Sequence, residues 1–258
     1  TYTPFQLGRE RDRITIAGTF AAQDVRSVLV AIHDAVENRG YSEIELDFAR
    51  CESAFSAAML PLCAHALQLR TNRIDIRLVL PNSDRLSRLF KNTGWAFFLC
   101  PRDHNEPNRG IVNRQFPATL FTNHEQQNLV LNDLLERLLA VIPNFNRSAF
   151  SAVEWALCEI TDNVTNHSKS SIGGLLQLSV FDIATKKVEF TVSDAGVGVA
   201  QTLREAKPKI SSDIDALMQS VRSGVTRNAV DYQGNGLYGT LEICRAGKGR
   251  FTLNAGHA

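Results

Sequence analysis

The chain has 258 residues and balances 28 lysines and arginines against 27 aspartates and glutamates, which gives a formal net charge of +1. Its length favours two domains over one, and its charge balance excludes a strongly basic nucleic-acid-binding module. Five cysteines without a C-x-x-C spacing, no signal peptide and no apolar run of membrane-spanning length predict a cytoplasmic protein with reduced thiols and no membrane partner.

The first hundred residues alternate between strand and helix patterns. Apolar runs, some of period two, predict strands over residues 14–20, 42–48 and 73–80. Apolar residues at helical spacing predict helices over residues 22–38, 53–69 and 83–92. This alternation predicts an α/β layer of mixed or parallel strands. Before it, residues 9–13 alternate in charge sign, which is typical of a solvated segment.

The strand Ile44-Glu-Leu-Asp-Phe48 leads into a helix of small residues. This order resembles the STAS domain, the family of the anti-anti-sigma proteins, which are substrates of anti-sigma kinases. The resemblance implies a STAS-like α/β domain over residues 1–100, with Ser56 at the position of the family's phosphorylated serine. The Asp, the second Ser and the Gly of the family motif are missing, which favours a serine that starts the helix over a phosphorylated one. We therefore expect a degenerate scaffold that binds a protein partner.

Residues 101–122 are predicted to form a linker, because they are rich in proline, asparagine and charge. An amphipathic helix is predicted next, over residues 125–141, with several leucines. These leucines are typical of a core helix in a second domain, and a dimer seam is the alternative.

The first of three short motifs is Glu159-Ile-Thr-Asp-Asn-Val-Thr-Asn-His167, which continues an apolar stripe of helical spacing. On a helix, Glu159, Asn163 and either Asn166 or His167 share a face. A carboxylate and an amide oxygen one turn apart suit Mg²⁺, which takes oxygen ligands and keeps waters or substrate phosphates. The carboxylate could instead polarise an attacking water. The alternative is a solvated polar helix face.

The second motif follows a predicted strand over residues 188–193 and contains Asp194, Gly196 and Gly198. Glycines allow a ligand to approach the backbone closely. A carboxylate at the end of a strand can accept a hydrogen bond from an exocyclic amine such as that of adenine. The alternative is a plain Asx turn, which Asp-x-Gly sequences form readily.

The third motif, formed by Gly234, Gly236 and Gly239, has the spacing G-x-G-x-x-G. The preceding residues 228–233 are polar and not a buried strand, which argues against a Rossmann dinucleotide site. An apolar helix is predicted over residues 237–246, and glycines at its start would expose N–H groups to a phosphate. An ordinary flexible loop before a helix is the alternative.

The three motifs in this order resemble the Bergerat-fold, or GHKL, ATPase superfamily. Its members include the gyrase B subunit, heat-shock chaperone ATPases, mismatch-repair ATPases, histidine kinases and anti-sigma serine kinases. The resemblance covers roughly residues 120–258, and the run Glu-x-x-x-Asn-x-x-x-His is closest to the anti-sigma branch. It implies an α/β-sandwich ATP-binding domain over residues 123–258, whose last strand we expect to be missing from this sequence. ATP and Mg²⁺ are the implied cofactors.

The resemblance also implies roles for single residues. Glu159 would be the general base and Asn163 would hold Mg²⁺, while His167 would lie near the phosphates. Asp194 would bind the adenine amine, with Gly196 and Gly198 shaping that pocket. Gly234, Gly236 and Gly239 would close the phosphate loop. Residues 199–233 would form a mobile lid, in which Thr226 and Arg227 would touch phosphate; Asp162 has no implied role.

These expectations together predict a histidine-kinase-like, nucleotide-binding signalling protein that binds and hydrolyses ATP with magnesium. Its nucleotide state would control the binding of a protein partner through the STAS-like domain, or a nucleotide-dependent homodimer. One alternative is a protein serine kinase of the anti-sigma type that acts on a STAS partner or on Ser56. Another is a non-catalytic adaptor with a relic ATP pocket. No nucleic-acid partner is indicated by the sequence.

Overall fold

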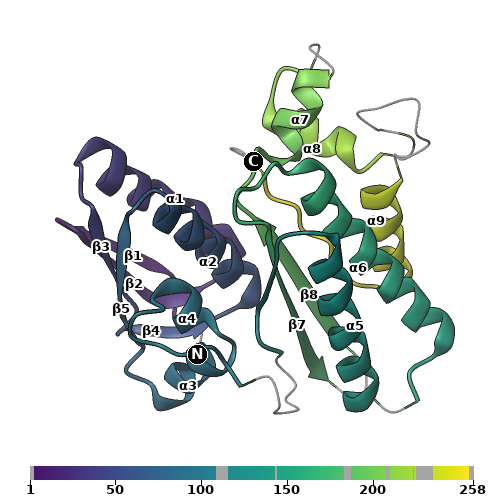
Figure 1. Ribbon diagram of the computed structural model, residues 1–258, viewed down its shortest axis with the longest axis horizontal. Coiled ribbons are helices and arrows are strands. Elements are labelled where there is room, and N and C mark those ends of the chain that lie inside the picture. Colours follow the sequence, from purple (N-terminus) through teal and green to yellow (C-terminus); the bar gives the residue numbers. More distant parts are fainter. Residues whose placement is uncertain are drawn as a thin grey trace. The chain divides into compact units, whose positions relative to one another are not determined.

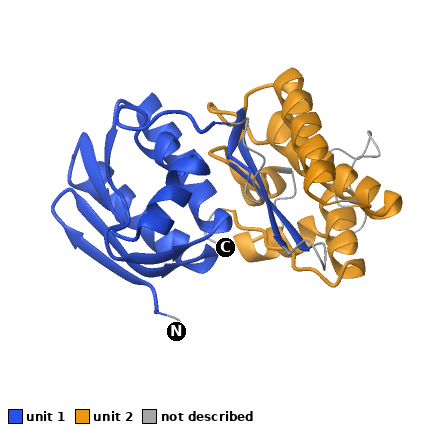
Figure 2. Ribbon diagram, turned by 90° about the horizontal axis from the view of Figure 1, so that it is seen from below, with its two compact units in different colours: residues 1–120, 175–193 blue, residues 121–174, 194–258 orange. Residues whose placement is uncertain are grey.

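The computed structural model describes residues 3–108, 116–142, 144–182, 187–206, 210–222, 224 and 235–255. It is a mixed α/β protein with one mixed sheet and one antiparallel sheet (Figure 1). Two compact units divide the chain (Figure 2): Thr1–Leu120 with Leu175–Ser193, and Phe121–Gly174 with Asp194–Ala258. Residues 175–193, which the sequence assigned to the second domain, are thus grouped with residues 1–120.

The mixed sheet of the first unit has the strand order β1-β2-β3-β5, and β4 pairs with β2. Its strands are β1 (Gln6–Glu10), β2 (Arg13–Phe20), β3 (Glu43–Asp47), β4 (Cys51–Ala54) and β5 (Asp75–Val79). β1 is antiparallel to β2, and the other pairs are parallel. The predicted strands are found as β2, β3 and β5. Residues 9–13, predicted to be a solvated segment, are mostly exposed, and they belong to a hairpin that turns at Arg11, where φ is 54°.

Helices α1 (Val25–His33) and α2 (Ser56–Thr71) pack on this sheet (Figure 1). A 3-10 turn (Ala22–Asp24) precedes α1 and a π-helical turn (Asp34–Asn38) follows it, which together fill the predicted helix 22–38. Helices α3 (Asp84–Asn92) and α4 (Trp95–Leu99) follow β5 in the same unit. The predicted start of α2 at residue 53 is wrong, because residues 51–54 pair with β2 before the helix begins.

Ser56 is the first residue of α2 and is 6% exposed. Its hydroxyl donates to Glu189 Oε1 at 2.5 Å and accepts from Thr191 Oγ1 at 3.1 Å. Phe55, and not Ser56, is the N-cap of the helix. Ser56 is therefore a helix-start serine as favoured from the sequence, but it bonds a strand and does not cap the helix.

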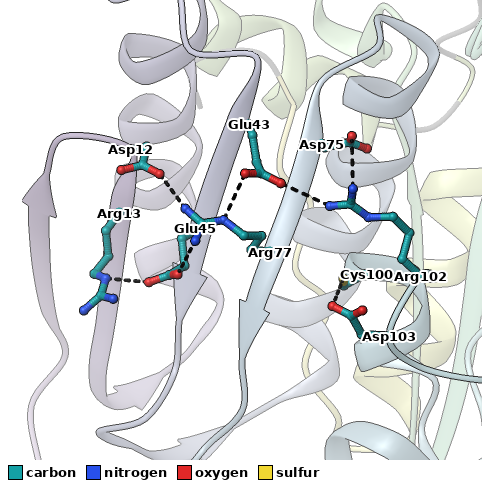
Figure 3. A network of polar contacts seen from close by, with 9 residues as sticks. All are labelled: Asp12, Arg13, Glu43, Glu45, Asp75, Arg77, Cys100, Arg102 and Asp103. Atoms are coloured by element: carbon teal, nitrogen blue, oxygen red, sulfur yellow. Dashed lines mark hydrogen bonds and ion pairs between the residues drawn. The ribbon is translucent and has the colours of Figure 1, made fainter.

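Charged side chains form a ladder across three strands of the first sheet (Figure 3). Arg13, Glu45 and Arg77 lie directly opposite one another on β2, β3 and β5. Glu45 Oε1 is 2.5 Å from Arg13 Nε, and its Oε2 is 3.2 Å from Arg77 Nη1. Glu43 extends the ladder, with ion pairs to Arg77 at 3.1 Å and to Arg102 at 3.2 Å. Opposite charges on neighbouring strands stabilise this register.

The antiparallel sheet has the order β6-β7-β8, with β6 (Thr119–Phe121), β7 (Gly174–Asp182) and β8 (Lys187–Asp194). The helices of the second unit are α5 (His124–Val141), α6 (Arg147–His167), α7 (Gly198–Ala206), α8 (Asp213–Ser220) and α9 (Gly236–Ala246). In Figure 1, α6 lies between α5 and α9, and α7 packs on α8.

Helix α5 buries most of its leucines, including Leu131, Leu134, Leu135 and Leu138, which favours the core helix over the dimer seam. All five cysteines are free, as predicted. Among the described residues, no helix combines the length and the apolar character that crossing a membrane requires.

Candidate functional site

Helix α6 is the element on which the three sequence motifs meet. Its N-cap, Asn146, accepts hydrogen bonds from the backbone N–H groups of Ser148 at 3.0 Å and Ala149 at 3.1 Å. Such a cap satisfies N–H groups that the first turn leaves without partners. One side of the helix is buried through Ala156, Leu157 and Val164. The helix is therefore anchored in the core, and its other sides are available for polar contacts.

The start of α9 lies directly against α6. A Cβ atom added to Gly236 would collide with the carboxylate of Glu159, and one added to Gly239 would collide with the ring of Trp155. Only glycine allows so close an approach of the two helices. The first and third motifs are therefore neighbours in the structure, with the Glu159 carboxylate beside the first turn of α9.

The loop that begins after Asp194 is attached to the C-terminal end of α6. Val197 N–H donates to the carbonyl oxygen of Ser168 at 2.8 Å. A Cβ atom on Gly196 would collide with the same carbonyl group, and Gly198 has a φ of 73°, which favours glycine. These contacts bring the second motif to the C-terminal end of α6, where the first motif also ends, at His167.

Asp194 is half-buried at the end of β8. Its Oδ1 accepts a hydrogen bond from Gly196 N–H at 2.7 Å, which is the Asx turn considered as an alternative. Burial raises the pKa of this carboxyl group, and the Gly196 N–H partly offsets that shift. The turn engages one carboxylate oxygen, so the same residue can present the second oxygen to an amine.

Glu159 and Asn163 share one face of α6, one turn apart. Burial raises the pKa of Glu159, and the negative charge of Asp162 raises it further. The Asn163 amide nitrogen donates to the carbonyl oxygen of Glu159 at 2.8 Å. Its amide oxygen is then the atom that can accept a cation or a hydrogen bond.

Asn166 and His167, the two candidates for the end of this face, differ in their contacts. Asn166 Oδ1 is 3.0 Å from the His124 ring on α5, so its side chain is engaged there. His167 has a buried ring nitrogen, Nδ1, without a hydrogen-bond partner among the described residues. Such orphaned polar atoms are rare in folded proteins and indicate an absent partner. His167 is thus the better candidate for a ligand contact.

A magnesium site must be judged from these donors. Within the described ranges, no group of three His, Cys, Asp or Glu side chains could hold a metal ion alone. Magnesium usually binds through one or two protein oxygens and completes its shell with substrate phosphates and water. Glu159 and Asn163 fit this mode of binding, in which a phosphate and water supply the remaining ligands of the ion.

Three of the predicted ligand residues, Thr226, Arg227 and Gly234, lie outside the described residues. The described part of the predicted lid is a pair of helices, α7 and α8. Ala200 and Leu203 of α7 form an apolar cluster with Ala216 of α8 and with Ile210, which precedes α8, and Arg204 forms an ion pair with Asp213.

Two residues of this region were not found from the sequence. Trp155 lies four positions before Glu159 and is 38% exposed, so helical spacing could have placed it on the same face. Ser168 contributes its backbone carbonyl oxygen. Every residue carries this group, so the sequence does not mark the contact.

All described residues of the site belong to the second unit. They come from α6, the end of β8 with the loop that follows it, and the first turn of α9, and they include two carboxyl groups of raised pKa, Glu159 and Asp194. Comparison of the chain with protein-family models, with curated proteins and with solved structures gives no match in any of the three.

Proposed function

We propose that this chain is a magnesium-dependent ATP-binding and ATP-hydrolysing signalling protein, with a Bergerat-type (GHKL) ATPase domain and an N-terminal STAS-like domain. The observation that carries the proposal is the contact of Glu159 with Gly236, on the same helix that holds the Asp194 loop at its end. Three motifs that are distant in sequence thus meet on one helix. The parallel pairing of β2, β3 and β5 supports the STAS-like part.

The spacing of the two ends of the site suits a nucleotide. The Gly236 contact is at Glu159 and the Gly196 contact is at Ser168, nine residues further along the chain. At the rise of an α-helix, these positions are about 13 Å apart. An adenine amine at Asp194 and phosphates near the start of α9 would leave the ribose and the remaining phosphates to span this distance.

Each residue has a role in the proposed reaction. Bound Mg²⁺ would neutralise phosphate charge. Glu159 orients a water molecule and accepts its proton, and its raised pKa improves its match to that role near neutral pH. Asn163 offers its amide oxygen to the cation. The nucleotide state would then change how a protein partner or a second copy binds.

Calorimetric titration with ATP and ADP in the presence of Mg²⁺ tests the proposal. We expect wild-type protein to bind both, and Asp194→Asn to weaken binding by at least ~100-fold, because the adenine amine loses its carboxylate acceptor. Asp75→Asn, which removes an exposed carboxylate of the first unit, is the matched control. Absence of binding to the wild type, or equal binding to Asp194→Asn, would overturn the assignment.

Labelled ATP then separates hydrolysis from protein phosphorylation. We expect release of inorganic phosphate that Glu159→Gln lowers by about 10²-fold, within the range for loss of a general base. Transfer of the label to Ser56 is not expected, because its buried hydroxyl is hydrogen-bonded to Glu189. Label found on a STAS partner, without free phosphate, would replace hydrolysis by the kinase alternative.

A further inference from the structure

A buried polar cluster joins α5 to α6 on a side of α6 that the proposed reaction does not use. Its centre is Gln127 of α5, which is 2% exposed. The Gln127 amide nitrogen donates to Thr161 Oγ1 at 2.9 Å and to Asp162 Oδ1 at 2.6 Å. Its amide oxygen accepts from Thr165 Oγ1 at 3.0 Å. One buried amide therefore makes three directional contacts with a single stretch of α6.

Such a cluster fixes the rotation of one helix against another. Apolar packing is non-directional and tolerates small rotations, whereas a buried amide must keep its hydrogen bonds or lose free energy. Successive residues of an α-helix are rotated by about 100°, so Thr161, Asp162 and Thr165 can meet one side chain only at one rotation of α6. The contact of His124 with Asn166 holds the same rotation one turn later.

The fixed rotation determines where the site face points. Asp162 lies three residues after Glu159, so the two are neighbours at the border between the α5 side and the α9 side. When Asp162 is held by Gln127, the Glu159 carboxylate faces the start of α9, and Asn163 lies on the same face of α6 one turn later. The Glu159 carboxylate lies so close to Gly236 that a small rotation would either open this contact or cause a collision.

We propose that Gln127 and Asp162 are positioning residues of the ATP site, which hold the Glu159 carboxylate against the start of α9 by fixing the rotation of α6. The inference rests on the proposed function for its effect on turnover. It also assigns a role to Asp162, which neither the motif nor the resemblance explained. Gln127 touches no reacting atom and acts only through α6.

The test is a swap of the hydrogen-bonding pair. Gln127→Glu places a carboxylate against Asp162, and Asp162→Asn in the same chain restores a donor between the two positions. We expect Gln127→Glu to lower kcat by ~10-fold or more with little change in the ATP Kd, because Asp194 lies outside the cluster. The double variant, Gln127→Glu with Asp162→Asn, should recover most of this loss of kcat. The effects of the two substitutions in a double-mutant cycle are then strongly non-additive. Glu136→Gln, on the exposed side of α5, is the control.

A readout without nucleotide separates this proposal from the proposed function. Trp95 is 2% exposed and Trp155 is 38% exposed, so acrylamide quenching of the free protein reports mainly on Trp155 beside Gly239. Quenching should change in Gln127→Glu and return in the double variant, even if the wild type hydrolyses no ATP. A lower melting temperature with unchanged quenching and unchanged kcat per folded molecule would reduce Gln127 to a stabilising residue and overturn the proposal.

Discussion

Asp194 combines a local structural task with the chemistry proposed for it. One oxygen closes a turn with Gly196 N–H, and burial raises the pKa of the whole group. A carboxyl group whose pKa rises on folding contributes stability below its unfolded pKa, and that contribution is lost as pH rises through the folded pKa. At neutral pH the ionised Asp194 therefore costs stability that only a ligand would recover.

The first prediction follows from this stability cost of the ionised Asp194 carboxylate. Asp194→Asn keeps an acceptor for Gly196 N–H and removes the buried charge, so we expect its free energy of unfolding at pH 7 to rise by about 1 kcal/mol. The gain should shrink as the pH approaches about 4, where the native carboxyl group is protonated. Urea unfolding across this pH range measures it. A variant less stable than wild type at pH 7 would contradict the assigned cost.

The two glycines at the start of α9 give a second prediction. Gly236→Ala meets the flexible end of Glu159, which can move aside, so we expect a loss of ATP turnover with a small loss of stability. Gly239→Ala meets the ring of Trp155, which is harder to displace, so we expect a loss of about 1–3 kcal/mol in stability. Thermal unfolding and phosphate release distinguish the two. Gly247→Ala, where an added Cβ has ordinary contacts, is the control, and equal effects at all three positions would contradict this reading.

At the scale of elements, the predicted periodic segments are found, whereas β1, β4 and the nine-residue strand β7 were not predicted. α5 and α9 were located within a residue of their observed starts, because apolar spacing marks them clearly. β4 has four residues and β1 carries mixed charges, so neither gives a period that distinguishes it from a loop. The site motifs were found as segments, but their meeting on α6 depends on a backbone carbonyl and on helix packing, which local sequence does not encode.

The charged ladder of the first sheet gives the third prediction. Glu45 is 7% exposed and depends on Arg77 and Arg13, whereas the pairs of Arg102 lie at the exposed rim (Figure 3). We expect Arg77→Met to lower the free energy of unfolding by about 1–3 kcal/mol, since a buried carboxylate loses a partner. Arg102→Met should cost no more than ~1 kcal/mol, as is usual for exposed ion pairs. Urea unfolding compares the two, and equal costs would show that Glu45 does not depend on Arg77.

At the scale of the whole molecule, the site and the first sheet belong to different units. The described site residues all fall within Phe121–Gly174 and Asp194–Ala258. The first unit has its own core, in which Phe20, Phe48, Phe90 and Trp95 make successive edge-on contacts at centroid distances of 6.2, 5.1 and 5.4 Å. These four side chains are buried and serve the packing of the first unit.

This division predicts where ATP should stabilise the protein. A ligand at 100 times its Kd adds about 2.7 kcal/mol to the stability of the form that binds it. With ATP and Mg²⁺, we expect slower amide exchange in α6, in residues 194–198 and in the first turn of α9, because these segments surround the proposed nucleotide. Strands β2 and β3 of the mixed sheet should keep their exchange rates, and Asp194→Asn should abolish the effect everywhere. Hydrogen–deuterium exchange measured with and without nucleotide decides it. Protection that appears only in β2 and β3 would show that the nucleotide binds outside α6, and the site would have to be sought in the first unit.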